Sequence, residues 1–403
     1  DFGSARFGEY SREEVLNVLQ ELEFSSLVPR IPSNAAAVNP TGLLPAQPDH
    51  TTTDDQITTN IVDTEDSLHR LCQLLADKKR FVIEGFAASE RLLETDLVGL
   101  AVAASGTESW YVPIGHESGE NLPAEKVLPH IIGLLEHPNN RITGHNLNAT
   151  LTLLSGYGLR PTLVQVGFDS AIAAHLVGEK ATSLRNLAFN RLSIELGSIQ
   201  DLLGSGRQKK TFDQCPISEA GQFAGVNVAI THLLCESLAT DLTKDGLTDY
   251  NRDHAMRLLP VLVQMQSHGI ALDASILASL DEELVYKIAE EESSAYDAVG
   301  HEFSINSPAQ LGDLLFKELG LPAGRKTQTG YSTDASVLEG IRDAHPVIEH
   351  VLQYRALTKL KSTYVDTLPL EVNPRTGRVH TTYNQAGAST GRLASNDPNL
   401  QNI

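Results

Sequence analysis

Cysteines are scarce in this sequence and lie far apart. The 403 residues contain three, Cys72, Cys215 and Cys235, and no C-x-x-C pair occurs. Disulfide frameworks and structural zinc sites need several cysteines at close spacing, so the sequence predicts neither. We expect the protein to act in the reducing cytoplasm, because three isolated cysteines suit that compartment.

Long apolar stretches are missing as well. The N-terminal DFGSARFGEYSREEV lacks the apolar centre of a signal peptide, and no run of about 18 apolar residues, the length of a transmembrane helix, occurs in the chain. We therefore expect a protein that no visible signal exports and that has no membrane partner.

Three common catalytic motifs are also absent. The sequence has no G-x-x-x-x-G-K-[ST], no G-x-S-x-G and no H-E-x-x-H. Phosphate-binding loops, nucleophile elbows and helical zinc sites of these types are thereby excluded. The fourteen histidines are scattered, and a lone one such as His145 is more often structural than a metal ligand.

The negative charge is unevenly distributed. The whole chain carries a formal charge of −20, which argues against binding polyanions over its full surface. Residues 321–403, however, hold 9 Lys and Arg against 7 Asp and Glu, a net +2, whereas residues 1–320 hold 22 against 44, a net −22. The C-terminal part is therefore the place to look for an anionic partner.

The length predicts two or three domains, because single hydrophobic cores stop growing at roughly 250 to 300 residues. Residues 33–60 are rich in Pro, Thr, Ala and Asp and are typical of a linker. Between residues 61 and 245, strand-like and helix-like segments alternate, which predicts a mixed sheet covered by helices. Beyond residue 246 the pattern is helical.

Individual elements can be placed from their periodicity and their end signals. A capping box at Ser11 and Glu14 starts a short helix, and another at Ser307 and Gln310, with Pro308 in the first turn, starts a helix that ends at Gly320. We expect strands at 81–87, 96–103, 109–115 and 141–145, and helices at 65–77, 148–158, 173–179, 273–300, 305–322 and 345–369. Residues 324–333 follow no apolar period and are expected to form a loop.

Basic and hydroxyl side chains gather near this loop. Arg355, Lys359 and Thr363 are spaced four residues apart and would share one face of the last helix. A solvated charged face is the commoner explanation of such a pattern. The adjacent loop, with Lys326, backbone N–H groups and hydroxyls, favours the alternative that this face binds phosphate oxygens.

The last 23 residues, TTYNQAGASTGRLASNDPNLQNI, are crowded with neutral hydrogen-bonding groups. They hold one arginine and one aspartate among many Asn, Gln, Ser, Thr and Gly. Donors of this kind can reach the acceptors in the minor groove of DNA, whose pattern hardly distinguishes one base pair from another. Composition alone would favour an ordinary polar loop.

Carboxylates are sparse where a nuclease would need them. Hydrolysis by two metal ions requires several carboxylates that converge on ions about 4 Å apart. The first strand offers only Glu84, and the helix start GHNLNATLTLL offers none. Asp169 is the one further candidate, and we expect it to act as a helix N-cap instead.

Six motifs in one order carry a specific resemblance. MQSHGIALD, FSINSPAQLGDLLFKELGLP, KTQTGYSTD, YRALTKLKSTYVDTLP, TGRVHTTYNQ and TGRLASNDPNLQNI look like the thumb and the entry to the palm of family A DNA polymerases of the bacterial polymerase I type. Residues 61–245 resemble, more loosely, the RNase H-like 3'–5' exonuclease domain of that family, and residues 1–32 the end of its 5'-nuclease region. The resemblance therefore implies an α/β domain followed by a helical thumb, residues 246–380, and the start of a palm, residues 381–403.

The resemblance implies a DNA-binding surface and its partners. The residues that it places at DNA are Lys326, Thr327, Thr329, Ser332, Thr333, Arg355, Lys359, Thr363, Arg392, Asn396, Asn399 and Gln401. The implied partners are primer–template DNA and, for the intact polymerase, deoxynucleoside triphosphates and Mg²⁺, with the protein acting as a monomer. The family usually has a second lysine where this chain has Gln328, so that phosphate contact is left unassigned.

Two departures from the family limit what the resemblance implies. Where active exonucleases have an Asp-x-Glu, a second Asp and a Tyr-x-x-x-Asp, this chain has Glu84 alone, Thr150, and Phe223 with Asn227. We therefore expect a degenerate proofreading domain that binds no metal. The family's catalytic aspartates lie beyond NLQNI, so we expect no catalytic residue in these 403 positions and no nucleotide incorporation by them alone.

Two other functions stay open at this point. One is a DNA-binding protein that is not an enzyme, and the other is an active 3'–5' exonuclease, which the missing carboxylates disfavour. The polymerase interpretation expects the reading frame to continue past Ile403 to an aspartate at the end of an apolar strand. The binding-protein interpretation expects a stop codon there.

Overall fold

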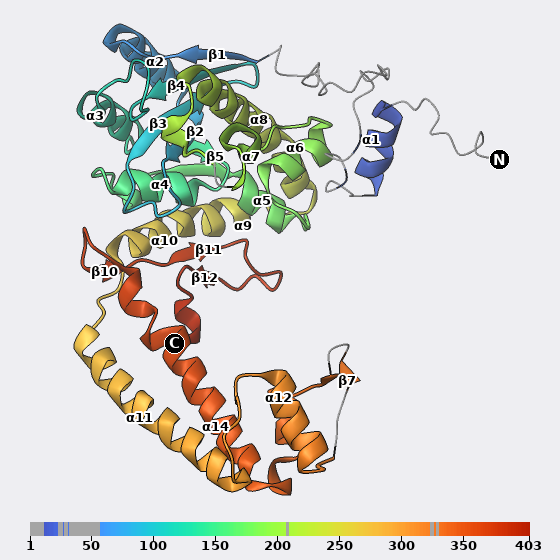
Figure 1. The fold of residues 1–403 in the computed structure, drawn as a ribbon. Coiled ribbons are helices and arrows are strands. Elements are labelled where there is room, and N and C mark those ends of the chain that lie inside the picture. The colour runs from blue at the N-terminus through green and yellow to red at the C-terminus, as the bar shows by residue number, and fades with distance from the viewer. Residues whose placement is uncertain are drawn as a thin grey trace, which may run out of the picture. The chain divides into compact units, whose positions relative to one another are not determined.

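The computed structural model describes residues 12–22, 27, 31, 57–206, 209–322, 326–327 and 330–403. The chain forms two compact units (Figure 1). Unit 1 comprises residues 1–268 and 381–396, and unit 2 comprises residues 269–380 and 397–403. The chain therefore returns to unit 1 near its end, and each unit is described by itself.

A six-stranded mixed sheet forms the centre of unit 1, as the sequence predicts. The strands follow the order β1-β4-β3-β2-β5-β6. They are β1 (Thr58–Ile61), β2 (Arg80–Ala87), β3 (Leu97–Ala103), β4 (Glu108–Pro113), β5 (Arg141–Gly144) and β6 (Val166–Asp169). The pairs β2–β3 and β3–β4 are antiparallel, and the other three pairs are parallel. Every residue of β3 is buried, so both faces of the sheet are covered.

Helices cover both faces of this sheet (Figure 1). They are α2 (Glu65–Lys78), α3 (Ala124–Leu135), α4 (Leu147–Ser155), α5 (Ser170–Leu176), α6 (Leu184–Leu192), α7 (Ile199–Leu203), α8 (Ile217–Lys244), α9 (Thr248–Tyr250) and α10 (Met256–His268). A π-helical turn, η6 (Asn251–Ala255), joins the last two, and 3₁₀ turns lie at η3 (Pro161–Leu163) and η5 (Phe212–Gln214). A separate helix, α1 (Arg12–Glu21), precedes them all.

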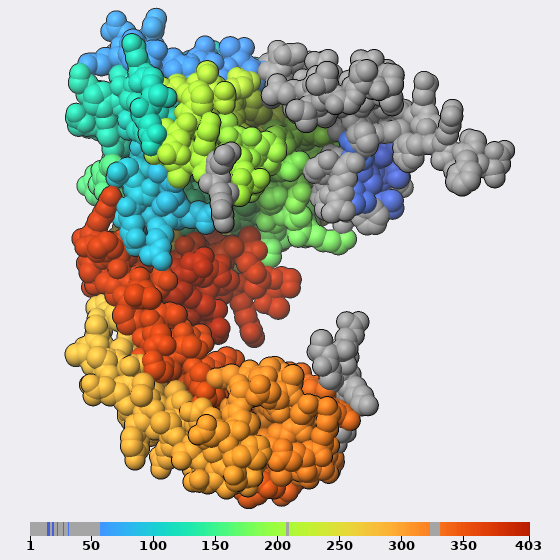
Figure 2. Space-filling model, in the orientation of Figure 1, coloured from blue at the N-terminus to red at the C-terminus, as the bar shows by residue number. Residues whose placement is uncertain are grey.

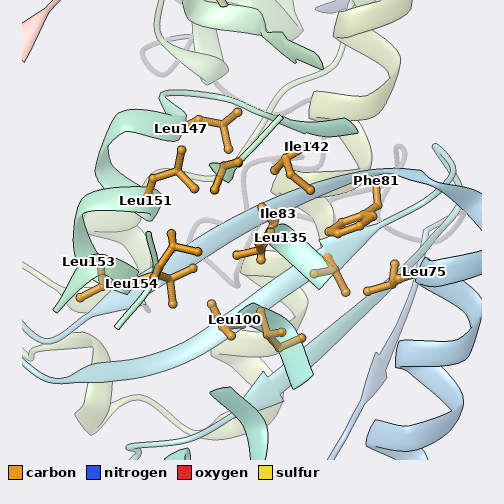
Figure 3. Packing of buried hydrophobic residues seen from close by; sticks show 14 of the residues in the cluster. Leu75, Phe81, Ile83, Leu100, Leu135, Ile142, Leu147, Leu151, Leu153 and Leu154 are labelled. Atoms are coloured by element: carbon orange, nitrogen blue, oxygen red, sulfur yellow. The ribbon is translucent and has the colours of Figure 1, made fainter. Parts of the chain in front are cut away.

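The period-2 alternation of β2 divides the core into two layers. Phe81 and Ile83 pack with α4 and its neighbours in a leucine-rich cluster (Figure 3). Val82 and Phe86 point the other way and pack against α8. The two layers fix α4 and α8 on opposite faces of the same strand.

Helix α8 approaches the sheet very closely through a glycine. A Cβ atom at Gly225 would collide with the hydroxyl groups of Thr59 and Ser109, so no side chain fits there. Among the described residues, α8 is also the one helix long and apolar enough to cross a membrane by length and composition. Its contacts with β1 to β4 are those of a core helix.

Asp169 is an N-cap, as the sequence predicts. It is almost fully buried, and its Oδ1 accepts hydrogen bonds from the N–H groups of Ala171 and Ile172 at 2.9 and 3.1 Å. Its Oδ2 accepts a 2.7 Å bond from the N–H of Leu147, at the start of α4. One carboxylate therefore holds the first turns of two helices.

Unit 2 is built mainly from helices. They are α11 (Ala274–Val299), α12 (Pro308–Asp313), α13 (Ala335–Glu339) and α14 (Pro346–Leu360), with π-helical turns η7 (Leu314–Glu318) and η9 (Lys361–Val365). Short turns lie at η8 (Arg342–Ala344), η10 (Leu368–Glu371) and η11 (Leu400–Asn402), and β9 (Val372–Asn373) pairs with β10 (Arg378–Val379). The apolar core of the unit joins α11, α12, η7 and α14.

Helix ends in unit 2 follow their sequence signals. Asp273 caps α11, and Gly300 ends it with a φ of +83°, a backbone conformation that suits glycine. His345 caps α14, whose first residue is Pro346. These ends agree with the predicted helices.

Four local predictions were wrong or fall outside the described residues. Residues 324–333 are not simply a loop, because β7 (Lys326–Thr327) pairs with β8 (Gly330–Tyr331). The capping box at Ser307 is not reciprocal, since the Gln310 side chain accepts from Ser304 instead. Strand β1 begins inside the predicted linker 33–60, whose residues 33–56 are not described, and Ser11 is not described either.

Candidate nucleic-acid interface

The predicted cations of the last helix lie in different environments. Arg355 on α14 is half-buried, and its guanidinium donates to the Thr333 carbonyl at 2.5 Å, to the Thr333 hydroxyl at 3.4 Å and to the Ile305 carbonyl at 3.4 Å. Lys359, one turn later on the same helix, is exposed. Arg355 therefore braces the neighbouring loop, while Lys359 faces solvent.

Two lysines near the end of α14 form a natural contrast. Lys361 makes 2.6 Å ion pairs with Asp281 and Asp366, and these partners raise the pKa of its amine. Lys359 is exposed two residues away. Thr363 is also exposed and lies in the π-helical turn η9, where its carbonyl accepts from Thr367 at 2.5 Å.

The predicted phosphate-binding loop, residues 324–333, has its last two hydroxyl groups buried. Ser332 and Thr333 are 8% and 5% exposed. The Ser332 hydroxyl donates to Asp334 at 2.9 Å, and the Thr333 hydroxyl accepts from Arg355. Lys326 and Thr327 form strand β7, and Thr329 lies outside the described residues. Of Lys326 and Thr327, the structure describes the backbone, which pairs β7 with β8.

Two further predicted residues lie on a β-hairpin of unit 1. We call residues 382–396 the terminal hairpin; it consists of β11 (Thr382–Asn384), β12 (Ala394–Asn396) and their connection. Arg392 and Asn396 are exposed on it, and Figure 2 shows its dark red segment at the surface of unit 1. At the base of the hairpin, the hydroxyl groups of Thr381 and Ser395 are hydrogen-bonded at 2.7 Å.

The remaining two predicted residues lie in unit 2. Asn399 and Gln401 are exposed, and the Asn399 side chain accepts from the Gln401 N–H at 3.1 Å. The turn η11 is held by the Tyr364 hydroxyl, which donates to the Asn402 carbonyl at 2.8 Å. The predicted set therefore divides into separate groups on the two units.

Two of the candidate nuclease residues contact β2 next to Glu84, and we call Glu84, Thr150, Phe223 and Asn227 the Glu84 centre. The Thr150 hydroxyl accepts from the Gly85 N–H at 3.0 Å, and the Phe223 ring packs edge-on against Phe86, with ring centres 6.5 Å apart. Phe223 and Asn227 also line a groove of about 580 Å³ between α8 and residues 196–202.

The donor set of the Glu84 centre does not fit two metal ions. Glu84 is its one carboxylate, and burial raises the pKa of that group to about 8. The nearby Asp169 is occupied by helix N–H groups. Among the residues that the structure describes, no cluster of three or more His, Cys, Asp or Glu could hold a metal.

Sequence reasoning missed the side chains that support the terminal hairpin. Gln266 on α10 and Asn148 on α4 both bond the backbone of Tyr383. Gln266 stands in the motif MQSHGIALD, but it has no pattern of its own there, because its partners are more than 110 residues away in the chain.

The chain is similar to known proteins of one family. Residues 274–403 match the model of DNA polymerase family A. The chain is 35% identical to DNA polymerase I of Chloroflexus aurantiacus, covering 100% of this chain and 46% of that protein. It is 32% identical to DNA polymerase I of Pseudomonas aeruginosa, covering 98% and 44%. The chain thus spans about half the length of these relatives.

A solved structure is similar as well. The polymerase domain of Pol1 from M. smegmatis, in complex with DNA primer-template and dNTP, superposes with a TM-score of 0.69 and 28% identity, over 86% of this chain and 56% of that one. The match extends over both the mixed α/β part and the helical part. From its motifs, its fold and these relatives, residues 274–403 of the chain belong to DNA polymerase family A.

Proposed function

We propose that this chain is the duplex-binding part of a DNA-directed DNA polymerase of the bacterial polymerase I type, working in replication and repair. The observation that carries the proposal is the set of exposed donors, Lys359, Thr363, Arg392, Asn396 and Asn399, within residues that match the family model. The solved relative that contains primer-template and dNTP supports the same partners for the intact protein.

Each domain has a place in this proposal. Residues 61–245 are proposed as an RNase H-like exonuclease domain that has lost its activity, residues 246–380 as the thumb and residues 381–403 as the start of the palm. Residues 1–32 are proposed as the end of a 5'-nuclease region, with 33–60 as a linker. A monomer that acts in the cytoplasm is part of the same proposal.

The DNA contacts are proposed in two groups. The loop with Lys326, Thr327 and Thr329, together with Lys359 and Thr363, would hold the phosphate backbone. The second group would reach the acceptors of the minor groove near the primer end; it comprises Arg392, Asn396, Asn399 and Gln401. Ser332, Thr333 and Arg355 would serve the first group by holding the loop, since their own polar groups bond within unit 2.

The chemistry of the intact enzyme is proposed from the family. The primer's 3'-hydroxyl would lose its proton and attack the α-phosphate of a deoxynucleoside triphosphate, and pyrophosphate would leave. Two metal ions, proposed to be Mg²⁺, would stabilise the charge that develops. The described residues form no such metal site, so they have no assigned step in this reaction. Their role is to hold and orient the duplex.

A binding titration tests this proposal. The 403-residue chain should bind a short labelled primer–template duplex of any sequence. The logarithm of its binding constant should fall linearly with the logarithm of the salt concentration. A chain that fails to bind the duplex at low salt, or binds it with no salt dependence, would contradict the proposal.

A digestion assay tests the proposed loss of nuclease activity. With Mg²⁺ present, the chain should leave the 3' end of single-stranded DNA intact, because the Glu84 centre has too few carboxylates for two ions. The matched control is Glu84→Gln. Digestion by the wild-type chain that disappears in this variant would show that the centre is active.

A further inference from the structure

The terminal hairpin is attached to unit 1 through a buried glutamine. Gln266 on α10 is 3% exposed. Its Oε1 accepts from the Tyr383 N–H at 2.8 Å and from the Asn148 side-chain amide at 2.9 Å. Its Nε2 donates to the Asn148 Oδ1 and to the Thr152 hydroxyl, both at 2.8 Å. One side chain therefore connects α10 with both α4 and β11, which Figure 1 shows on either side of α10.

At Tyr383, both the N–H and the carbonyl of the hairpin backbone are hydrogen-bonded to side chains of other elements. While the Tyr383 N–H donates to Gln266, the Tyr383 carbonyl accepts from the Asn148 amide at 3.2 Å. Tyr383 also pairs with Ser395 in β12, the residue next to Asn396. The two amide side chains thus take the place of a neighbouring strand along the outer edge of β11.

A role in helix packing alone does not account for this amide. The contact between α4 and α10 has its own polar bond, 2.6 Å between the Ser155 and Ser267 hydroxyls, and an apolar cluster that includes Leu259 and Val263 of α10. An apolar side chain at position 266 would serve that packing. A buried amide with four hydrogen bonds fixes one arrangement of its partners, because any shift leaves a buried polar group unpaired.

We infer that Gln266 and Asn148 are positioning residues that set the place of the terminal hairpin, and through it the place of Arg392 and Asn396 at the minor groove. The nuclease-like region of unit 1 then keeps a function in DNA binding that does not need its carboxylates. This inference rests on the proposed function, because it concerns the same DNA contacts.

A double-mutant cycle tests the inference in the full chain. The variants are Gln266→Met, which keeps the length of the side chain and removes its hydrogen bonds, Arg392→Ala, and the two combined. Duplex affinity is measured for each. Arg392→Ala should weaken binding about tenfold, and Gln266→Met should weaken it by a similar factor. The combined variant should lose no more than about twofold beyond Arg392→Ala, because both changes remove the same contact.

The matched control is Ser267→Ala. It removes a hydrogen bond from the same contact between α4 and α10, and the Ser267 hydroxyl bonds Ser155 and the Val263 carbonyl, which both lie outside the terminal hairpin. Its affinity should equal that of the wild type. Gln266→Glu keeps the acceptor for the Tyr383 N–H but loses the two bonds that Nε2 donates, so it should recover only part of the binding that Gln266→Met loses.

Hydrogen exchange checks that the variants act through the hairpin. In Gln266→Met, the amides of residues 382–384 should exchange faster, while those of the buried strand β3 should stay protected. Asn148→Ala should show the same pattern, and it replaces Gln266→Met if that variant does not fold.

The outcomes separate the inference from the proposed function. A wild-type chain that does not bind the duplex overturns both. If the wild type binds and Arg392→Ala weakens it, but Gln266→Met binds as the wild type does, the inference alone is wrong. Losses that multiply in the combined variant would also overturn it, because they would show that Gln266 acts independently of Arg392.

Discussion

In the interior of unit 1, Asp169 and Thr150 have their polar atoms bonded by the protein itself, whereas on α14 and the terminal hairpin several polar side chains are left to solvent. The Asp169 carboxylate accepts three backbone hydrogen bonds and the Thr150 hydroxyl accepts one. Lys359 and Arg392 are exposed. Polar side chains that would suggest chemistry in a sequence are therefore structural in the first region and exposed in the second.

The largest expected effect concerns Asp169. Asp169→Ala should lower the free energy of unfolding by about 3 kcal/mol, because it leaves three buried N–H groups at the starts of α4 and α5 unpaired. Urea unfolding measures this change. Asp169→Asn, which keeps acceptor oxygen, should cost less. An unchanged urea midpoint in Asp169→Ala would show that Asp169 has no structural role, and would contradict the contrast between the interior of unit 1 and the exposed side chains.

Arg355 is half-buried, between the buried and the exposed polar side chains compared above. Arg355→Ala should destabilise the 324–333 loop by about 2 kcal/mol, since its guanidinium bonds the carbonyl and the hydroxyl of Thr333 and ties them to the Ile305 carbonyl. Hydrogen exchange of residues 330–334 measures the change, with Lys359→Ala as the control on the same helix. Equal exchange in both variants would show that Arg355 does not brace the loop.

Glu84 adds a pH dependence to unit 1. Burial raises the pKa of its carboxyl group from an ordinary 4.5 to about 8, so the folded state holds a proton that the unfolded state loses. Stability should therefore fall as the pH rises from about 5 to 8, by up to ~1 kcal/mol per pH unit. Glu84→Gln should remove this fall and leave the stability below pH 4 nearly unchanged. Identical pH profiles of the two proteins would contradict the raised pKa.

Local sequence signals were sufficient for much of the fold. The expected strand at 81–87, the expected helix at 273–300 and the expected N-cap at Asp169 correspond to features that the structure contains. These signals succeed because they act over one or two helical turns. The pairing of β7 with β8 was missed because two residues per strand leave no period to detect.

The candidate site was harder to predict, for a physical reason. Spacing placed Arg355 and Lys359 on one face of a helix, but it could not show that the first is bonded to Thr333 and the second is exposed. The support of the terminal hairpin by Gln266 was equally invisible, because its partners at Thr152 and Tyr383 are more than 110 residues away in the chain. Burial and long-range hydrogen bonds depend on the completed fold.

The two neighbouring lysines give the most direct measurement. Lys359→Ala and Lys361→Ala each remove one positive charge from the end of α14, but Lys361 is already paired with Asp281 and Asp366. If Lys359 contacts a DNA phosphate, Lys359→Ala should lower the slope of log affinity against log salt by about one for every duplex sequence, and Lys361→Ala should leave it unchanged. A slope unchanged in Lys359→Ala, or lowered equally in both variants, would contradict the proposed duplex contact.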